Sequence, residues 1–284
     1  MNYTVTAAWL AEKFDQQNVV VIDCRFSLQN PSEGKTQFLA GHIPSAVYFD
    51  LNKDLSGAPG KHGGRHPLPV ENDFKQLLQK SGVSNSSIVV AYDGGEGAFA
   101  SRCWWLLRYF GHEQVYILNG GFKEWQAHQL PIETEQQQPE EVIFTPNIQH
   151  EMKTDVDEVK KIVNGETTSI LIDSRSYDRY IGQNEPIDRV AGHIPGAINK
   201  DWMNVLHKGF FLKDAEQENR FADWEKDRSI VVYCGSGITA TPNIIALKQA
   251  GFQNVKLYPG SYSDWVSYDD NEIELGDSTD FVKK

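Results

Sequence analysis

An internal repeat constrains the fold of this 284-residue chain more than any other feature. Four landmarks occur twice, each pair in the same order along the chain. They are VVVIDCR (19–25) and SILIDSR (169–175), LAGHIPSAVYFD (39–50) and VAGHIPGAINKD (190–201), SIVVAYDGGEG (87–97) and SIVVYCGSGIT (229–239), and VYILNGGFKEW (115–125) and VKLYPGSYSDW (255–265). Repetition on this scale predicts a tandem duplication of one domain.

The repeat also sets the expected domain boundaries. We expect an N-terminal domain at 1–132, a linker at 133–150 and a C-terminal domain at 151–284. The linker includes ETEQQQPEE (133–141), a polar stretch typical of a spacer. With 40% hydrophobic residues, the chain has enough apolar surface for a core in each half.

Each half alternates short β-branched runs with helix-length amphipathic stretches, such as 71–82 and 241–252. This alternation predicts an α/β fold, with a mostly parallel sheet flanked by helices in each domain. Ligands of such sheets usually bind at the carboxyl ends of the strands. Cys234 directly follows the run SIVVY (229–233), so it is expected at such an end.

Small and flexible residues follow Cys234. They are Gly235, Ser236, Gly237, Ile238, Thr239 and Ala240. Glycines let a loop curl so that successive backbone N–H groups point inward and bind an anion. Thr241 and Pro242 are expected to start a helix whose positive end adds to this effect. Both features favour a thiolate over a thiol, so we predict a reactive cysteine.

The matched position in the first half is Asp93, within YDGGEGAFASR. Free cysteines are often small buried residues with no chemical role, and this is the structural alternative for Cys234. A cysteine that served only packing would be matched by another small apolar residue rather than by an aspartate. We therefore predict that Cys234 is catalytic and that the first half is inactive.

The net charge and the number of cysteines disfavour several classes of protein. The formal net charge of −12 disfavours nucleic acid and anionic membrane as partners, since both reward clustered Lys and Arg. No apolar run approaches the ~20 residues that span a bilayer, and no signal peptide is recognisable, so we expect a cytoplasmic location. Three widely spaced cysteines predict neither a disulfide framework nor a cysteine-based metal site. Cys24 and Cys103 are expected to be inert.

These motifs resemble those of the two-domain rhodanese-type sulfurtransferases, the family of thiosulfate and 3-mercaptopyruvate sulfurtransferases, over nearly the whole chain. The residues that carry the resemblance are AGHIPGAI (191–198), CGSGITA (234–240), GGFKEW (120–125) and GSYSDW (260–265). The resemblance implies two rhodanese-like domains, the first inactive and the second catalytic, with a site where the two meet.

The resemblance also implies a reaction. The Cys234 thiolate attacks the outer sulfur of a small anionic donor and becomes a persulfide. The sulfur then passes to cyanide or to a thiol acceptor, such as a thioredoxin-like protein or a low-molecular-weight thiol. Neither a metal nor an organic cofactor is expected.

The charge of the residues directly after Cys234 helps to predict the sulfur donor. In the family, loops that serve the thiosulfate dianion carry Arg and Lys directly after the cysteine, whereas this chain has Gly235 and Ser236. The neutral loop resembles the 3-mercaptopyruvate type, with thiosulfate as the alternative donor. Arg179 in SYDRYIG matches a family arginine that grips the donor carboxylate, and Arg189 is a candidate for a second one.

The resemblance further implies a Ser-His-Asp relay in which Ser236 supplies the hydroxyl and His66, in RHPLP, is contributed by the N-terminal domain. The position of the aspartate holds Asn52. An asparagine can orient a histidine but cannot stabilise its cation, so either the relay is weakened or His66 acts in another way.

Two other functions compete with this interpretation of the sequence. A cysteine phosphatase needs an arginine six residues after the nucleophile, where this chain has Ala240. A non-catalytic sulfur-binding or sensing module is the other alternative, because duplicated domains are often recruited for recognition. Recurrence in both halves predicts structural roles for His42 and His193 in the GHIP turns, and for the Asp-Arg pairs of the first strands.

Overall fold

The computed structural model describes residues 3–277 and divides the chain into two compact units. The first comprises residues up to 57, 68–149 and 207–211, and the second comprises 58–67, 150–206 and residues from 212 onward. The units therefore differ from the predicted sequence halves in two short segments, 58–67 and 207–211. Within residues 3–277, no helix is long and apolar enough to cross a membrane.

The first unit is built on a five-stranded parallel sheet in the order β1-β5-β4-β2-β3. Its strands are β1 (Thr4–Val5), β2 (Val19–Asp23), β3 (Val47–Tyr48), β4 (Ile88–Tyr92) and β5 (Val115–Leu118). Val21 pairs with Val90, and Ala91 pairs with Ile117, so the most apolar strands lie at the centre. This arrangement confirms the predicted α/β class.

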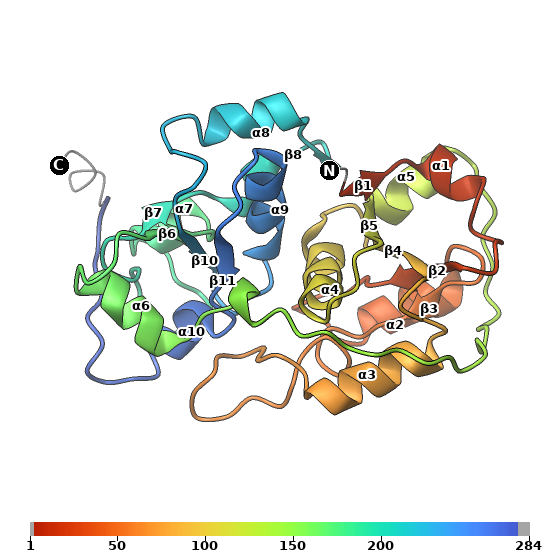
Figure 1. The fold of residues 1–284 in the computed structure, drawn as a ribbon, viewed down its shortest axis with the longest axis horizontal. Helices are drawn as coiled ribbons and strands as arrows, with labels where there is room; N and C mark the ends of the chain where they lie inside the picture. The colour runs from red at the N-terminus through yellow and green to blue at the C-terminus, as the bar shows by residue number, and fades with distance from the viewer. Residues whose placement is uncertain (1–2, 278–284) are drawn as a thin grey trace. The chain divides into compact units, whose positions relative to one another are not determined.

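Helices cover both faces of this sheet (Figure 1). They are α1 (Ala7–Ala11), α2 (Glu33–Ala40), α3 (Glu71–Lys80), α4 (Ala98–Tyr109) and α5 (Gly121–Ala127). The first two and the last share one core cluster with the sheet, through Leu10, Phe38 and Trp125. Helix α4 is buried along nearly its whole length, and Trp104 and Trp105 belong to the core as predicted.

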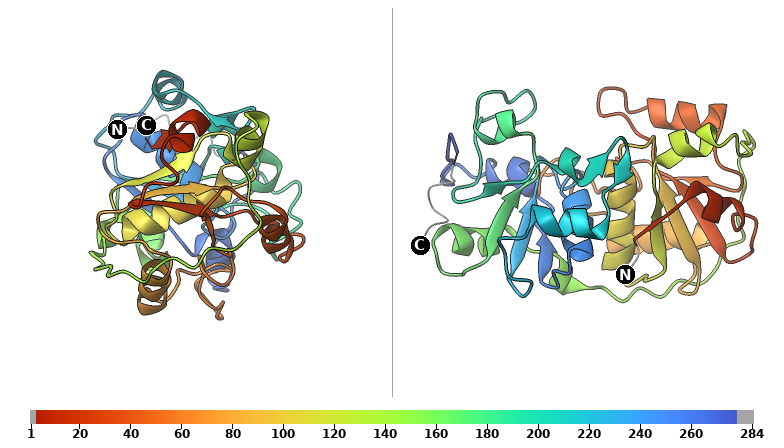
Figure 2. Two further views of the ribbon diagram at one scale, coloured as in Figure 1. Left: turned by 90° about the vertical axis from the view of Figure 1, so that its right-hand side faces the viewer. Right: turned by 90° about the horizontal axis from the view of Figure 1, so that it is seen from above.

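The second unit repeats this plan on a four-stranded parallel sheet in the order β11-β10-β6-β7. Its strands are β6 (Ile170–Asp173), β7 (Ile198–Asn199), β10 (Ile230–Tyr233) and β11 (Val255–Leu257). A separate two-stranded sheet is formed by β8 (Leu206–His207) and β9 (Phe210–Phe211), and its residues 207–211 belong to the first unit. Figure 2 shows the strands of each sheet side by side. All four residues of β10 are buried, which makes it a rigid support for the loop that follows.

Helices also flank the second sheet. They are α6 (Val156–Val163), α7 (Tyr177–Tyr180), α8 (Asp214–Arg220), α9 (Thr241–Gln249) and α10 (Ser261–Trp265), with the short 3-10 turns η1 (His150–Met152) and η2 (Trp202–Val205). Val159, Tyr180 and Trp265 pack in one core cluster with the sheet. The amphipathic character expected of α9 is wrong, because seven of its nine residues are buried.

Both units share one structural anchor at the end of the first long strand. In the first, Arg25 Nη2 lies 2.6 Å from Asp23 Oδ2 and donates to the Gly41 carbonyl at 2.7 Å. In the second, Arg175 makes the same two contacts with Asp173 and Gly192 at the same distances. The predicted buried ion pairs are confirmed, and each ties the strand to the GHIP turn.

The histidines of the GHIP turns are also structural, as predicted. His42 Nδ1 lies 2.7 Å from the Phe38 carbonyl oxygen, and His193 Nδ1 lies 2.8 Å from that of Tyr180. Both side chains are fully buried. Each ring therefore fastens its turn to the preceding helix.

The residues of the predicted linker are not a free spacer up to residue 149. Phe144 is fully buried, and the amides of Val142 and Asn147 donate to the carbonyl oxygens of Gln79 and Phe110. This stretch contains no helix and, apart from a bridge at Glu133, no strand pairing. It therefore packs along the first unit although its composition is polar.

Candidate functional site

Cys234 directly follows β10, at the carboxyl end of the sheet, as the sequence predicts. Its amide donates to Ser261 Oγ at 3.1 Å, and its carbonyl accepts from the Tyr262 amide at 2.9 Å. The residue is only 1% exposed. These contacts from the start of α10 fix the backbone of the cysteine at the end of the strand.

The loop after Cys234 has the curled shape that its glycines predict. Gly237 has a φ of +77°, and a Cβ there would clash with the Pro259 carbonyl oxygen. Within residues 3–277, the amides of Ser236, Ile238 and Ala240 donate to no protein acceptor. Unpaired N–H groups in such a loop are the usual binding partners of an anion, so this loop has the features of an anion-binding nest.

The helix start after this loop differs from the prediction in one detail. Thr241 is the first residue of α9 rather than its cap, and the cap position is held by Ala240 with no side-chain bond. The Thr241 hydroxyl instead donates to the Ile238 carbonyl at 2.8 Å. Thr239 is partly exposed in the same turn. The positive end of α9 still faces the loop, since its first turn directly follows it.

Ser236 and His66 are brought together, with His66 Nδ1 2.8 Å from Ser236 Oγ. The sequence predicts this pair as part of a relay. The expectation that the histidine comes from the N-terminal domain is corrected, because segment 58–67 belongs to the second unit. The pair therefore lies within one compact unit.

Segment 58–67 is held against the region around α10 by backbone and side-chain contacts. The Gly63 amide donates to Asp264 Oδ1 at 2.7 Å, and the Arg65 amide donates to Ser263 Oγ at 3.1 Å. His62 stacks on Tyr268 with ring centroids 4.0 Å apart. These contacts explain why a segment from the first sequence repeat joins the second unit.

Arg179, in α7, is also brought to the Cys234 loop. Its Nε donates to Glu185 Oε2 at 3.0 Å, and its Nη2 donates to Asp188 Oδ2 at 2.8 Å. A Cβ built on Gly235 would lie 3.3 Å from Arg179 Nη2, so the guanidinium borders the residue next to the nucleophile. This position supports the predicted role of Arg179 at the site.

Arg189 points elsewhere. Its Nε donates to the Val266 carbonyl at 2.6 Å and its Nη2 to Asp269 at 3.1 Å. More than half of the side chain, 57%, is exposed. A role in donor binding for Arg189 stays a prediction that these contacts do not support.

Three charged residues of the site are missing from the sequence-based prediction. Arg65 forms an ion pair with Asp188, whose side chain is only 1% exposed. Burial raises the pKa of Asp188, and the Arg65 charge opposes that shift. Burial acts to raise the pKa of Glu185, but the hydrogen bond and charge of Arg179, together with bonds from the amides of Ile187 and Asp188, hold this pKa below its usual value. The one available signal was the position of Arg65 directly before His66.

Asn52 lies in the first unit and is exposed. Its amide donates to Asp50 Oδ1 at 2.9 Å, and Asp54 Oδ2 accepts from the Asp50 amide at 2.7 Å. These residues therefore form a local turn. A part for Asn52 in a relay stays a prediction.

Asp93 occupies the matching loop of the first unit. Its Oδ1 accepts from the amides of Gly95 and Gly97, both at 3.0 Å, and its Oδ2 accepts from those of Phe99 and Ala100, both at 3.1 Å. The carboxylate is 1% exposed. A resident anion thus occupies this nest. Burial raises its pKa while the backbone hydrogen bonds oppose the shift.

The other two cysteines lie in the first unit, and both are buried. Burial raises the pKa of the Cys24 thiol, and the neighbouring Cys103 adds to the shift. A raised pKa keeps a thiol protonated and unreactive, which agrees with the predicted inertness of Cys24. Among the described residues, no group of three or more His, Cys, Asp or Glu side chains is arranged to hold a metal ion.

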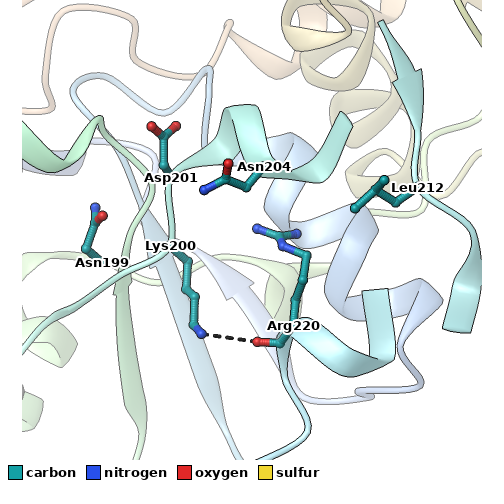
Figure 3. Close-up of a pocket in the computed structure, with 6 residues that line it drawn as sticks. All are labelled: Asn199, Lys200, Asp201, Asn204, Leu212 and Arg220. Carbon is teal, nitrogen blue, oxygen red and sulfur yellow. Dashed lines mark hydrogen bonds between the residues drawn. The ribbon is translucent and has the colours of Figure 1, made fainter. Parts of the chain in front are cut away.

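A separate polar pocket of about 340 Å³ lies in the second unit and is lined by Asn199, Lys200, Asp201, Asn204, Leu212 and Arg220 (Figure 3). The Lys200 ammonium donates to the Arg220 carbonyl at 3.1 Å. Burial lowers the pKa of Arg220 to about 10. None of the predicted site residues lines this pocket, so it is distinct from the Cys234 loop.

Comparison with protein families identifies the family of both units. The model of the rhodanese-like domain matches twice, at residues 6–128 and 155–268. The chain belongs to the rhodanese family. The suspected family and the predicted pair of rhodanese-like domains are thereby confirmed.

The relatives of this rhodanese-family chain are sulfurtransferases. It is 38% identical to a probable 3-mercaptopyruvate sulfurtransferase of Pseudomonas aeruginosa over 96% of this chain and 98% of that protein. It is 31% identical to the thiosulfate sulfurtransferase of Bos taurus over 92% and 91% of the two chains. A crystal structure from Escherichia coli, described as showing the rhodanese fold and catalytic mechanism of 3-mercaptopyruvate sulfotransferases, matches with a TM-score of 0.82 and 33% identity, over 93% of this chain and all of that one.

Proposed function

We propose that this protein is a sulfurtransferase whose second unit carries sulfur as a persulfide on Cys234. The observation that supports this most directly is the nest around Cys234, where the amides of Ser236, Ile238 and Ala240 have no acceptor among residues 3–277. An anionic sulfur there accepts the hydrogen bonds that Asp93 accepts in the first unit. The first unit is the inactive domain, since its nest holds a carboxylate that cannot attack sulfur.

The first half-reaction uses 3-mercaptopyruvate as the favoured donor. The Cys234 thiolate attacks the donor sulfur, so that an S–S bond forms and the C–S bond breaks. The electron pair of the broken bond goes to carbon and gives the enolate of pyruvate, which takes up one proton. The persulfide remains on Cys234, and its negative outer sulfur is stabilised by the loop amides.

Ser236 and His66 handle the proton of this step. The donor has a thiol proton to lose, and the enolate has a proton to gain. A hydroxyl hydrogen-bonded to an imidazole at 2.8 Å is suited to move a proton between the two. The relay needs only these two residues, since Asn52 supplies no negative charge.

Arg179 binds the donor carboxylate, because a guanidinium fork forms charge-assisted bonds with a carboxylate. The loop itself stays neutral at Gly235, where a longer side chain would meet the Arg179 guanidinium. The probable 3-mercaptopyruvate sulfurtransferase among the relatives favours the same donor. Thiosulfate is the second candidate, favoured by the similarity to the bovine thiosulfate sulfurtransferase.

In the second half-reaction an acceptor attacks the outer sulfur, and the Cys234 thiolate leaves. Cyanide and thiols both have the required nucleophile. We propose a thiol acceptor, either a thioredoxin-like protein or a low-molecular-weight thiol. The cytoplasmic location and the lack of nucleic-acid and membrane partners stay predictions from the sequence.

A side-by-side steady-state comparison of 3-mercaptopyruvate and thiosulfate tests the choice of donor. With the same acceptor, we expect kcat/KM to be about tenfold or more higher for 3-mercaptopyruvate, the factor that one charge-assisted bond provides. A higher value for thiosulfate would move the assignment to thiosulfate sulfurtransferase. A protein that forms a persulfide but turns over neither donor would be a sulfur-binding or sensing module.

A further inference from the structure

The position of Arg65 carries an inference beyond the residues assigned so far. Its backbone is fixed by the bond from its amide to Ser263 Oγ at 3.1 Å. Its side chain reaches Asp188, a residue 123 positions away in the sequence. The Arg65 side chain is 35% exposed, whereas Asp188 is only 1% exposed. The guanidinium therefore extends from a buried partner toward solvent.

Asp188 joins two arginines. Its Oδ1 pairs with Arg65 Nη1, and its Oδ2 accepts from Arg179 Nη2 at 2.8 Å. One buried carboxylate thus holds the two guanidinium groups side by side. Glu185 accepts from Arg179 Nε and fixes the second group further.

Both guanidinium groups also border Gly235. A Cβ built there would lie 2.9 Å from Arg65 Nη2, 3.3 Å from Arg179 Nη2 and 3.6 Å from Arg179 Nη1. Within the described part of the chain, Arg65 Nη2 and Arg179 Nη1 donate to no protein acceptor. Two N–H groups from different arginines therefore remain available beside the residue that follows the nucleophile.

We propose that Arg65 is a second donor-binding residue and that Arg65 and Arg179 together clamp the donor carboxylate. Asp188 is a positioning residue, since it acts by holding both guanidinium groups. The proposal rests on the sulfurtransferase function given above. It assigns to Arg65 the role that the contacts of Arg189 do not support.

A structural role is the competing explanation. In that case Arg65 serves only to fasten segment 58–67 through Asp188, and its loss would disturb His66 and Ser236 without any preference for charge. A charge-selective measurement on Cys234 separates the two explanations. Iodoacetate and iodoacetamide alkylate the same thiolate, but only iodoacetate carries a carboxylate.

The experiment compares wild type with Arg65→Gln, Arg65→Lys and Ser263→Ala in the full chain. The ratio of the alkylation rate constants, iodoacetate over iodoacetamide, should fall about tenfold in Arg65→Gln, the loss of one charge-assisted bond. Arg65→Lys keeps the positive charge but loses the two-pronged guanidinium, so in this variant the ratio should fall less. Ser263→Ala loosens the same segment but keeps the guanidinium, so its ratio should match wild type.

Kinetics with 3-mercaptopyruvate give a second readout. Arg65→Gln should raise KM about tenfold while kcat changes little, because the lost interaction binds the donor before the chemical step. An unchanged ratio and an unchanged KM in Arg65→Gln would overturn the proposal, as would an equal fall of the ratio in Ser263→Ala. If wild type forms no persulfide at Cys234, the sulfurtransferase function itself fails, which is a different result.

Discussion

The loops that follow β4 and β10 have the same backbone arrangement but differ in the residue at which each loop begins. Each follows a buried central strand, curls through glycines and enters a buried helix. In the first unit the loop amides donate to the Asp93 carboxylate. In the second unit the residue at that place is Cys234, and the amides of Ser236 and Ile238 have no acceptor in the part of the chain that the structure describes.

The shape of the loop can therefore be kept without the residues that sulfur transfer requires. Both units keep the Asp-Arg anchor, the GHIP turn and the strand-loop-helix frame. Between the anchor arginine and the GHIP turn, the second unit carries two arginines, Arg179 and Arg189, whereas residues 26–40 of the first unit contain none. Under the proposed function, the nest of the second unit is an active site because it also holds a nucleophile and cations that bind the donor.

In the loop after β4, we expect Asp93→Ala to lower stability more than any other change. It removes the acceptor of four amides, three of them in buried hydrogen bonds, so we expect the free energy of unfolding of the first unit to fall by about 2–4 kcal/mol. Sulfur transfer should be nearly unchanged at a temperature where the variant is folded. Thermal unfolding and steady-state assays check the two parts.

Asp93→Asn is the matched control for this prediction. It keeps one oxygen acceptor and should lie between Asp93→Ala and wild type in stability. If Asp93→Ala abolished transfer with an undiminished melting temperature, the first unit would not be inactive, and the contrast between the loops would be wrong.

A smaller effect on stability is expected at Glu96, the other carboxylate of the loop after β4. Burial, helped by the Asp93 charge, raises the pKa of Glu96 from 4.5 to about 8. Between these values the folded state binds more protons than the unfolded state, so stability falls as pH rises through this window. Glu96→Gln removes this loss.

The free energy of unfolding of Glu96→Gln should therefore match wild type near pH 4.5 and exceed it by about 1–3 kcal/mol at pH 9. Denaturant unfolding at several pH values measures this difference. A constant difference across the whole pH range would mean that Glu96 does not titrate in the folded state as described.

Much of the frame could be predicted from the sequence because its signals are local. The repeated strand runs, the GHIP turns and the glycines after Cys234 each act within a few residues. The pairing of Ser236 with His66 also followed, though only through the resemblance to the family. The membership of segment 58–67 in the second unit did not follow, because it depends on contacts with residues about 200 positions away.

The arginine arrangement shows the same limit. Arg179 could be found from its motif, but Arg65 and Asp188 meet across 123 positions, and neither pattern nor composition pairs them. Arg189 is a candidate only through the resemblance to the family, and its segment is spaced differently from that of the family. Its contacts with Val266 and Asp269 depend on the tertiary packing around it. Long-range ion pairs of this kind need the folded chain.

The central claim is that one sulfur atom, that of Cys234, carries the transferred sulfur. Its most direct test is to mix the full chain with 3-mercaptopyruvate in the absence of acceptor and to locate the added sulfur by peptide mass spectrometry. We predict a gain of one sulfur atom on the Cys234 peptide, retained in Cys24→Ser/Cys103→Ser and absent in Cys234→Ser. A persulfide found on Cys24 or Cys103, or full transfer activity in Cys234→Ser, would contradict the account.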